Sequence, residues 1–361
     1  MKQIRVFTWI LCLLLCACTA GGPINTVSEA SALPTAEPTI EPAQEEVVTV
    51  AVTPEQTLPP TPEPTPTPEP TPEPTPEPTP TPEPTGLLGV KYLEKFTDEP
   101  NLDEWSYSDP NMSISVEKFT VYETYGKVQT YYVADIYVQD VTLIRTAAAR
   151  GSFKHGYGLV VKEIAESAHA LVAIDGDSYF GFKDSFVYRN GEPYRKNLHE
   201  RTDLCILYRD GTMETKAWGT FSAADVIKSD PWQVWSFGPR LLEEDGSPRT
   251  IKHRLSYENP RSAIGYYEPG HYCFVIVDGR QVVDDKGTYS DGMTLDQLAQ
   301  LMSDLGCKAA YNLDGGASAE MYWNGEIISH SSNATRVVSD IIYLAPDWML
   351  AASDASDTNE P

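Results

Sequence analysis

Basic residues are scarce in this chain, which carries 27 Lys and Arg against 52 Asp and Glu, a formal net charge of −25. A protein that binds nucleic acid needs a basic surface to neutralise phosphates, and this sequence offers no basic stretch. Residues 19–90 contain no Lys or Arg at all. The composition therefore excludes a nucleic-acid partner, and the acidity is better explained as a means of keeping the chain solvated and extended.

Cysteine is scarce as well, with six residues in the whole chain. Three of them lie within the first 18 residues, which leaves Cys205, Cys273 and Cys307. An odd number in a domain of about 260 residues does not indicate a disulfide scaffold. Cys273 and Cys307 stand in or beside apolar runs, so we expect them to be buried as small hydrophobic side chains.

Long apolar runs are absent after the N-terminal segment Val6–Leu15, which follows two basic residues and is too short to span a bilayer. Such a segment is typical of a signal peptide. The sequence Leu-Cys-Ala-Cys that ends at Cys18 resembles a bacterial lipobox, with cleavage before Cys18 and lipid on its sulfur. The alternative is an ordinary signal peptide cut near Ala20. We expect an exported protein at the cell surface, lipid-anchored to the outer face of the cytoplasmic membrane.

The next region consists almost entirely of Pro, Thr and Glu, with Thr-Pro-Glu-Pro repeats between residues 61 and 85. Alternating prolines forbid helix and sheet and favour polyproline II, which rises about 3.1 Å per residue. About fifty such residues would reach on the order of 150 Å, so the region predicts a stalk. A peptide-ligand role for the prolines is the alternative.

These patterns predict four parts of the chain. Residues 1–18 are expected to be a lipoprotein-type signal peptide and residues 19–86 a disordered Thr/Pro/Glu stalk. Residues 87–347 are expected to form the folded domain, and residues 348–361 a disordered tail.

Segments rich in β-branched and aromatic residues dominate the folded part and predict strands. Two long ones, 113–123 and 128–138, flank a turn at 125–127 and predict a hairpin. Five shorter ones are expected to be buried strands: 171–174, 204–208, 273–277, 309–313 and 341–344.

One helix is clearly predicted after residue 294. Thr294 and Gln297 have the spacing of a capping box, apolar residues follow at helical spacing, and Gly306 is expected to end the helix. The order strand, helix, strand from Cys273 to Leu313 indicates a local crossover unit. The sequence therefore predicts an α+β fold built as a single mixed-sheet domain.

Three predicted strands run directly into acidic residues and glycine: Asp175-Gly176-Asp177, Asp278-Gly279-Arg280 and Asp314-Gly315-Gly316. A carboxylate at a strand end is held by rigid backbone, and a neighbouring glycine lets a ligand approach the main chain closely. Each segment taken alone is typical of a turn. Three in one domain favour a shared acidic site.

Other catalytic chemistries find little support. The six His residues show no paired helical spacing and no Cys pair is present, so zinc is not expected. No EF-hand pattern occurs, and the Gly-x-Ser-x-Gly motif of serine hydrolases is absent. We therefore expect no metal and no cofactor.

The segment 311–318, Tyr-Asn-Leu-Asp-Gly-Gly-Ala-Ser, resembles the Asn-Leu-Asp-Gly-Gly-Gly-Ser signature of the phosphodiester glycosidase family. Segments 173–180, 260–265, 277–280 and 336–340 resemble further motifs of that family in the same order along the chain. Two positions depart from it, because Asp175 stands where the family usually has Asn and Ala317 replaces a common Gly. The resemblance implies a domain of the phosphodiester glycosidase type.

The resemblance also implies hydrolysis of a sugar-1-phosphodiester, which frees the sugar and leaves a phosphomonoester. Breaking a glycosidic bond usually takes two carboxyl groups, and the expected pair is Asp177 and Asp314, with Asp278 in reserve. Which of the pair is the acid stays open. Arg261 is expected to hold the phosphate through charged hydrogen bonds. The remaining expected substrate-binding residues are Asp175, Arg280, Asn312, Gly315, Gly316, Ser318 and Arg336.

The expected partners are a sugar phosphodiester or a phosphate-containing surface glycan, and the membrane through the lipid anchor. Two alternatives to hydrolysis stay open. One is a non-catalytic module that binds envelope glycan, and the other is a transferase that moves a sugar or phosphosugar during assembly of a surface polymer.

Overall fold

The computed structural model describes residues 88–122, 127–181, 185–198, 201–252, 256–282, 288–329 and 336–350. All of them belong to one compact unit, Glu77–Pro361. The expected signal peptide with Cys18, the stalk and residues 351–361 lie outside the described residues, as does the tip of the predicted turn at 125–126.

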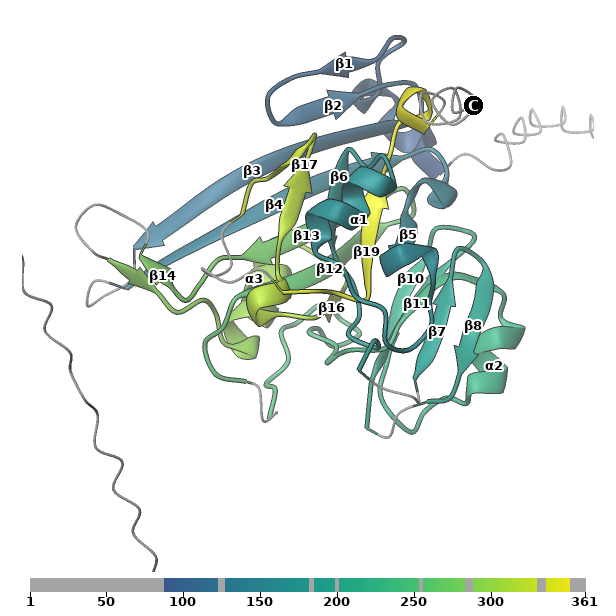
Figure 1. The fold of residues 1–361 in the computed structure, drawn as a ribbon, viewed down its shortest axis with the longest axis vertical. Helices are drawn as coiled ribbons and strands as arrows, with labels where there is room; N and C mark the ends of the chain where they lie inside the picture. Colours follow the sequence, from purple (N-terminus) through teal and green to yellow (C-terminus); the bar gives the residue numbers. More distant parts are fainter. Residues whose placement is uncertain are drawn as a thin grey trace, which may run out of the picture. The chain divides into compact units, whose positions relative to one another are not determined.

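The largest sheet has seven strands in the order β1-β2-β3-β4-β13-β12-β16 (Figure 1). Its strands are β1 (Asn101–Leu102), β2 (Ser106–Ser108), β3 (Met112–Tyr122), β4 (Val128–Val138), β12 (Arg261–Glu268), β13 (His271–Val277) and β16 (Ala309–Asn312). The predicted hairpin is confirmed, since β3 and β4 pair antiparallel from Met112↔Val138 to Tyr122↔Val128.

A second sheet has the order β18-β17-β6-β19-β5. Its strands are β5 (Arg145–Ala148), β6 (Val172–Asp175), β17 (Met321–Trp323), β18 (Glu326–Ile327) and β19 (Asp340–Leu344). The helix α1 (Val161–Ser167) covers one face of this sheet, where Ile164 packs with Ala173 and Ile341 (Figure 1). The other face packs on the seven-stranded sheet, because Ile174 and Ile342 share a core with Phe274 and Ile276.

The helix α3 (Leu295–Asp304) covers the outer face of the seven-stranded sheet. Residues of β13 divide between two cores, with Phe274 and Ile276 facing the second sheet and Val275 and Val277 facing α3. This alternation is the period of two that a strand imposes on its side chains. The domain therefore has four layers: α1, the five-stranded sheet, the seven-stranded sheet and α3.

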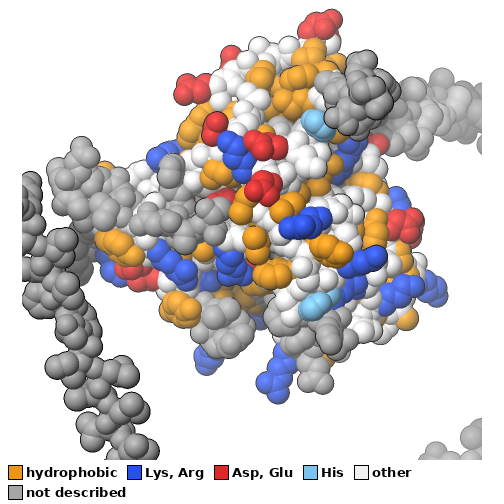
Figure 2. Space-filling model, in the orientation of Figure 1, with side chains coloured by type: hydrophobic (Ala, Val, Ile, Leu, Met, Phe, Trp, Pro, Cys, Tyr) orange, Lys and Arg blue, Asp and Glu red, His pale blue; other side chains and the backbone are white. Residues whose placement is uncertain are grey.

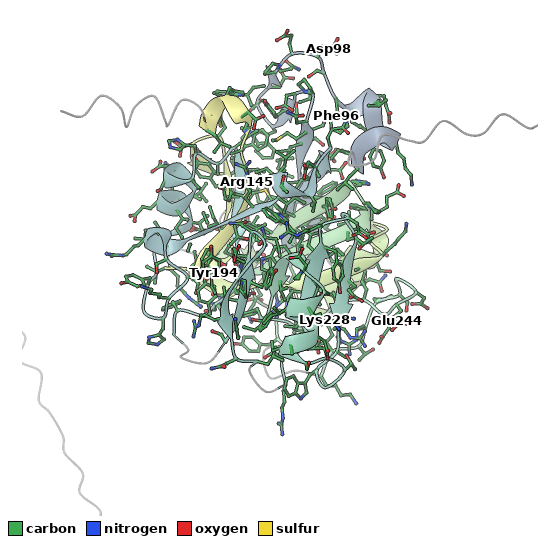
Figure 3. All side chains as sticks on the ribbon, turned by 90° about the vertical axis from the view of Figure 1, so that its right-hand side faces the viewer. Phe96, Asp98, Arg145, Tyr194, Lys228 and Glu244 are labelled. Atoms are coloured by element: carbon green, nitrogen blue, oxygen red, sulfur yellow. The ribbon has the colours of Figure 1, made fainter. Side chains whose placement is uncertain are left out.

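A third sheet, β10-β9-β11-β7-β8, has a separate small core with α2 (Ala223–Lys228). Its strands are β7 (Phe186–Arg189), β8 (Glu192–Lys196), β9 (Leu204–Tyr208), β10 (Met213–Lys216) and β11 (Pro231–Trp235). In Figure 3, Lys228 at the end of α2 and Glu244 lie at the lower end of the domain, opposite Phe96 and Asp98.

Short elements complete the described chain. The pair β14 (Gln281–Val282) and β15 (Tyr289–Ser290) forms a two-stranded sheet. Four 3₁₀ helices are η1 (Leu88–Lys95), η2 (Val141–Leu143), η3 (Ala149–Gly151) and η4 (Gly316–Ser318). None of the helices in the described ranges is long and apolar enough to cross a bilayer.

The predicted helix is confirmed with its capping box. The Thr294 side chain accepts from the Gln297 amide, the Gln297 side chain accepts from the Thr294 amide, and Gly306 follows with a φ of +84°. The crossover unit is present too, since β13 and β16 both pair antiparallel with β12 and so run parallel to each other.

The α+β class is confirmed, but the strands form several sheets and every pairing among the described residues is antiparallel. The parallel relation that a crossover helix creates is found between β13 and β16, which are separated by β12. The predicted single α+β domain is therefore confirmed, with antiparallel sheets among the described residues in place of a mixed one.

The domain also extends past residue 347, where the sequence predicts its end. The Trp348 indole donates to the Tyr107 hydroxyl at 3.2 Å, and Met349 packs against the main core. Apolar side chains with a docking surface are sufficient to order these three residues, 348–350.

The expected burial of Cys273 and Cys307 is confirmed; Cys205 is buried as well, and all three are free thiols. The sulfurs of Cys273 and Cys307 are 3.8 Å apart. Both sulfurs lie against Gly265, where a Cβ would be 2.6 Å from Cys273 Sγ and 2.7 Å from Cys307 Sγ. A glycine is needed there because the thiols occupy the space of a side chain.

Candidate active site

The loop after β16 carries the most connected carboxylate of the site. Asp314 is 4% exposed, and its Oδ2 accepts from the Ser318 hydroxyl at 2.9 Å and from Arg336 Nη2 at 2.8 Å. Burial raises the pKa of Asp314, whereas Arg336 and Ser318 oppose the rise and so favour the carboxylate. The pKa of Asp314 is therefore set by two opposing effects, burial and the ion pair with Arg336.

The end of β6 lies directly beside this loop, since the Asp314 amide donates to the Gly176 carbonyl at 3.1 Å. Asp177 is 2% exposed, and its charge contributes to raising the pKa of Asp314. Two segments that are far apart in the sequence therefore bring the two expected carboxylates into one electrostatic neighbourhood. The contact arises because β6 and β16 belong to two sheets that pack face to face.

Asp177 is paired with Arg189 of β7, whose Nη2 donates to Asp177 Oδ2 at 2.7 Å. Burial raises the pKa of Asp177, and the charge of Arg189 and the amide of Ser236 act in the opposite direction. A buried arginine is found where a carboxylate needs a partner, because an unpaired charge inside a protein is costly. Arg189 and its second partner, Asp340, are absent from the site that the sequence predicts.

Asp175 is fully buried, and both of its carboxyl oxygens lack a well-formed hydrogen bond among the described residues. Burial raises its pKa well above the usual range, and the charge of Asp314 adds to this, against weaker effects of the Ser262 hydroxyl and the Glu320 amide. Burial of this kind favours the neutral, protonated form of a carboxyl group over the carboxylate.

Arg261, at the start of β12, is 4% exposed and is held by the backbone. Its Nε donates to the Met293 carbonyl at 2.9 Å and its Nη2 to the Tyr257 carbonyl. Burial, with a smaller contribution from the nearby charge of Arg280, lowers the pKa of Arg261 to about 10. Arg261 therefore stabilises the backbone beside the loop at residues 314–318. Its side chain is less accessible to a phosphate than the role predicted from the sequence requires.

Arg280 and Arg336 are the accessible arginines next to the loop. The Arg336 side chain is 43% exposed while it contacts Asp314. Arg280 is exposed and donates to the Asn259 side chain, and its Nη1 would lie 3.4 Å from a Cβ at Gly316. One arginine thus stands at each end of the segment Asp314–Gly316.

Gly315 and Gly316 have different structural roles in the loop. A Cβ on Gly315 would lie 2.8 Å from the Pro260 carbonyl oxygen, so only glycine lets the loop approach β12 this closely. The Gly316 amide donates to the same carbonyl at 2.9 Å. That amide is therefore committed to the fold and is not available to a ligand, contrary to the expectation from the sequence.

The remaining predicted residues lie around this loop. Asn312 donates to the carbonyls of Gly238 and Leu313, while its buried Oδ1 lacks a partner among the described atoms. Asp278 is buried at the end of β13, where its amide donates to the Thr130 carbonyl at 2.9 Å. Because Val277 pairs with Arg261, Asp278 lies at the Arg261 edge of the seven-stranded sheet.

Metal binding gains no support from the described part of the chain, in which no group of three or more His, Cys, Asp or Glu side chains could hold an ion. Figure 2 shows Lys and Arg side chains spread over the middle and lower part of the face in view. Such a surface is compatible with an anionic ligand.

Glu320 is a further acidic neighbour that the sequence analysis missed. It precedes β17 and lies one residue beyond the last β17–β6 pair, Met321↔Ile174, which places it opposite Asp175. Burial raises the pKa of Glu320 from 4.5 to about 7. A signal was present in the sequence, because Glu320 directly follows the glycine signature between an alanine and an apolar strand.

Glu320→Gln is expected to stabilise the domain at pH 8 and to have no effect at pH 4. The folded state holds the Glu320 proton more tightly than the unfolded state, so stability falls as pH rises from 4.5 to about 7 and then levels off. After allowance for solvent screening, the gain at pH 8 is about 1–2 kcal/mol. Urea unfolding at both pH values measures it. The exposed Glu244→Gln (Figure 3) is the control, and an equal gain there would contradict the prediction.

Comparisons with known proteins agree with this geometry. Residues 168–345 match the family model described as phosphodiester glycosidase. The SPbeta prophage-derived uncharacterized protein YomE of Bacillus subtilis (strain 168) is 27% identical in an alignment of 201 positions that covers 52% of this chain and 30% of that protein. This chain therefore spans about a third of the length of that relative.

A solved structure with the same architecture comes from zebrafish. The zebrafish N-acetylglucosamine-1-phosphodiester alpha-N-acetylglucosaminidase catalytic domain, auto-inhibited by its pro-peptide, superposes with a TM-score of 0.53 at 20% identity. The match covers 69% of this chain and 88% of that one. At this identity the likeness shows the architecture alone, and the family model adds the sequence evidence. The stretch from residue 168 to residue 345, which contains Asp175, Asp177 and Asp314, therefore matches the phosphodiester glycosidase family model, and it lies in a domain with the architecture of a phosphodiester glycosidase catalytic domain.

Proposed function

We propose that this domain hydrolyses the glycosidic bond of sugar-1-phosphodiesters in envelope or exopolysaccharide material. The observation that carries the proposal is the loop Asp314–Ser318, where a buried carboxylate accepts from the exposed Arg336 at 2.8 Å. A second exposed arginine, Arg280, stands against Gly316. A phosphodiester places one negative charge next to the bond to be broken, so it needs a cation and a carboxyl group side by side.

The chemistry takes two carboxyl groups, and Asp177 with Asp314 is the proposed pair. One donates a proton to the leaving phosphate oxygen, and the other attacks the anomeric carbon or activates water. Water supplies a hydroxyl to the sugar and a proton to the phosphate, which leaves as a phosphomonoester. Since a phosphate is already a good leaving group, stabilising its charge is as important as protonating it.

A second candidate function follows from the burial of the same carboxylates. Asp177 is 2% exposed and tied to Arg189, and Asp314 is nearly as buried. A site whose carboxylates are so enclosed would suit a module that binds a phosphate-containing envelope glycan without turnover. In that case the carboxylates order the loop and the arginines bind the ligand.

The deciding experiment uses a panel of sugar-1-phosphodiesters with the wild-type chain and Asp314→Asn in ¹⁸O-labelled water. Hydrolysis of the glycosidic bond puts ¹⁸O on the free sugar, whereas cleavage of the phosphorus–oxygen bond puts it on the phosphate. Mass spectrometry of both products measures this. Label on phosphate, or glycan binding with no product, would contradict the proposal. Addition of an acceptor sugar reveals a transferase as a new glycoside.

The proposal includes a location. The N-terminal signal, lipidation of Cys18 and the Thr/Pro/Glu stalk would hold the domain on the outer face of the cytoplasmic membrane and extend it into the envelope. A sugar phosphodiester within a surface polymer would then be within reach. Metabolic labelling with a lipid precursor, compared between wild type and Cys18→Ala, tests the anchor.

A further inference from the structure

Arg189 is fully buried in the site, with 0% exposure, as is its partner Asp340. Its Nε donates to Asp340 Oδ2 at 2.9 Å and its Nη2 to Asp177 Oδ2 at 2.7 Å. Its Nη1 donates to the carbonyls of Tyr188 and Val234. Every nitrogen of the guanidinium group is therefore engaged, and the fork points two of them at two different carboxylates.

Aromatic rings flank the guanidinium group. Its Cζ lies 5.9 Å from the ring centroids of both Tyr179 and Trp235. Contacts of this kind keep a cation in place while they exclude water. The side chain is thus held by two carboxylates, two carbonyls and two rings, which leaves it a single orientation.

Asp340 connects Arg189 to the backbone of the site. Its Oδ1 accepts from the Asp177 amide at 3.0 Å, and its carbonyl accepts from the Gly176 amide at 3.0 Å. A Cβ on Gly176 would lie 2.3 Å from Asp340 Oδ1, so a glycine is required at that position. The Gly176 carbonyl in turn accepts from the Asp314 amide. The Arg189–Asp340 pair therefore reaches both proposed catalytic carboxylates.

The two oxygens of Asp177 have unequal surroundings. Oδ2 accepts from Arg189 and from the Ser236 amide at 2.8 Å. Oδ1 is buried and makes no hydrogen bond to the described residues. One oxygen is therefore saturated by donors, while the other keeps its lone pairs for a reacting atom or proton.

We propose that Arg189, together with Asp340, is the positioning residue of the reaction: it holds Asp177 as a carboxylate whose Oδ1 is the oxygen that acts. This inference rests on the proposed function. It assigns Asp177 the role of nucleophile or base, which leaves the donation of a proton to Asp314 or to the fully buried Asp175. It also explains why a charge is buried here at all, since an apolar side chain would fill the space more cheaply.

A purely structural Arg189 would stabilise the fold without tuning Asp177, and pH profiles separate the two roles. Arg189→Lys keeps a charge but cannot reach both carboxylates, and Asp340→Asn removes the second anchor. Both variants are expected to raise the acid-side pKa of kcat/KM by about 1–3 units, because a close cation lowers a carboxyl pKa by that amount. The value of kcat is expected to fall about 100-fold with KM little changed, as for a misplaced reacting group.

The exposed Arg209→Lys, on β9–β10, is the matched control and is expected to retain the wild-type profile. Melting temperatures and active-site counts correct every rate for the folded fraction. If Arg189→Lys does not fold, Asp340→Asn carries the test. Variants that melt earlier but keep the wild-type kcat and acid limb per folded molecule would overturn the proposal.

A second measurement does not depend on turnover. The carboxylate band of Asp177, obtained by infrared difference between each protein and the same protein with Asp177→Asn, is followed against pH. The band is expected to persist to lower pH in the wild type than in Arg189→Lys. An unchanged titration would overturn the role of Arg189. A shifted titration in a protein that turns over no diester would refute the proposed function alone.

Discussion

Replacing Asp314 by Asn is expected to lower kcat for a sugar-1-phosphodiester by about 10²–10⁴-fold, the usual contribution of a positioned acid or base. The substitution keeps the size of the side chain and leaves one oxygen to accept from Ser318 and Arg336. It removes the charge and the ability to exchange a proton. Initial rates under saturating substrate measure the loss.

Two further variants make this result interpretable. The exposed Asp98→Asn (Figure 3) controls for the change in net charge and is expected to leave the rate unaltered. Asp278→Asn tests the reserve candidate at the Arg261 edge of the sheet. If Asp278→Asn abolished turnover while Asp314→Asn retained it, the assignment of the catalytic carboxylate would be wrong.

Removing both exposed arginines, as Arg280→Met with Arg336→Met, is expected to weaken phosphodiester binding by about 10²–10³-fold. A hydrogen bond to a charged group contributes about 1.5–3 kcal/mol, and each factor of ten corresponds to about 1.4 kcal/mol. The expected total is smaller than the sum of two full contributions because both side chains are solvent-exposed. Titration calorimetry with a phosphodiester, in the Asp314→Asn background, measures the change.

The salt dependence and a neutral ligand provide the controls. Binding through two arginines is expected to weaken as ionic strength rises, and the double variant should lose that dependence. Affinity for the free sugar should stay as it is. Arg209→Met removes an exposed arginine paired with Asp230, and equal weakening there would show that the net charge alone is responsible.

Local sequence patterns predicted the elements whose stability is local. The helix α3 has a complete capping box and an apolar face, and the run Cys273–Val277 is apolar on both sides, as a strand buried between two layers requires. The hairpin β3–β4 is long and rich in β-branched and aromatic residues. In each case the pattern that predicts the element lies within one short stretch of the chain.

Some elements contain residues whose intrinsic preferences do not favour that element, and the sequence did not predict them. The strand β7 ends in Arg189, a residue type that is mostly exposed, and β11 begins at Pro231, which is tolerated only at the first position of such a strand. The helix α1 has seven residues and no side-chain cap at its N-terminus. Tertiary contacts stabilise all three, and a single sequence does not contain that information.

The same distinction applies to the site. The segments Asp175–Asp177 and Asp314–Ser318 could be predicted because carboxylates and glycines follow apolar strands directly. Their long-range partners could not, because Arg189 and Asp340 reach Asp177 only through the order of strands in two sheets. The preference for Arg261 as phosphate ligand was reasonable by motif, yet its backbone hydrogen bonds and burial make Arg280 and Arg336 the more accessible candidates.

The contact between Gly176 and Asp340 also limits how this site can diverge. Any residue larger than glycine at 176 would collide with the carboxylate at 340, and a shorter residue at 340 would release Arg189. The two positions can therefore change only in concert. Neither single change is an accessible intermediate, so mutational drift in this corner of the molecule is expected to be slow even where the surrounding surface varies freely.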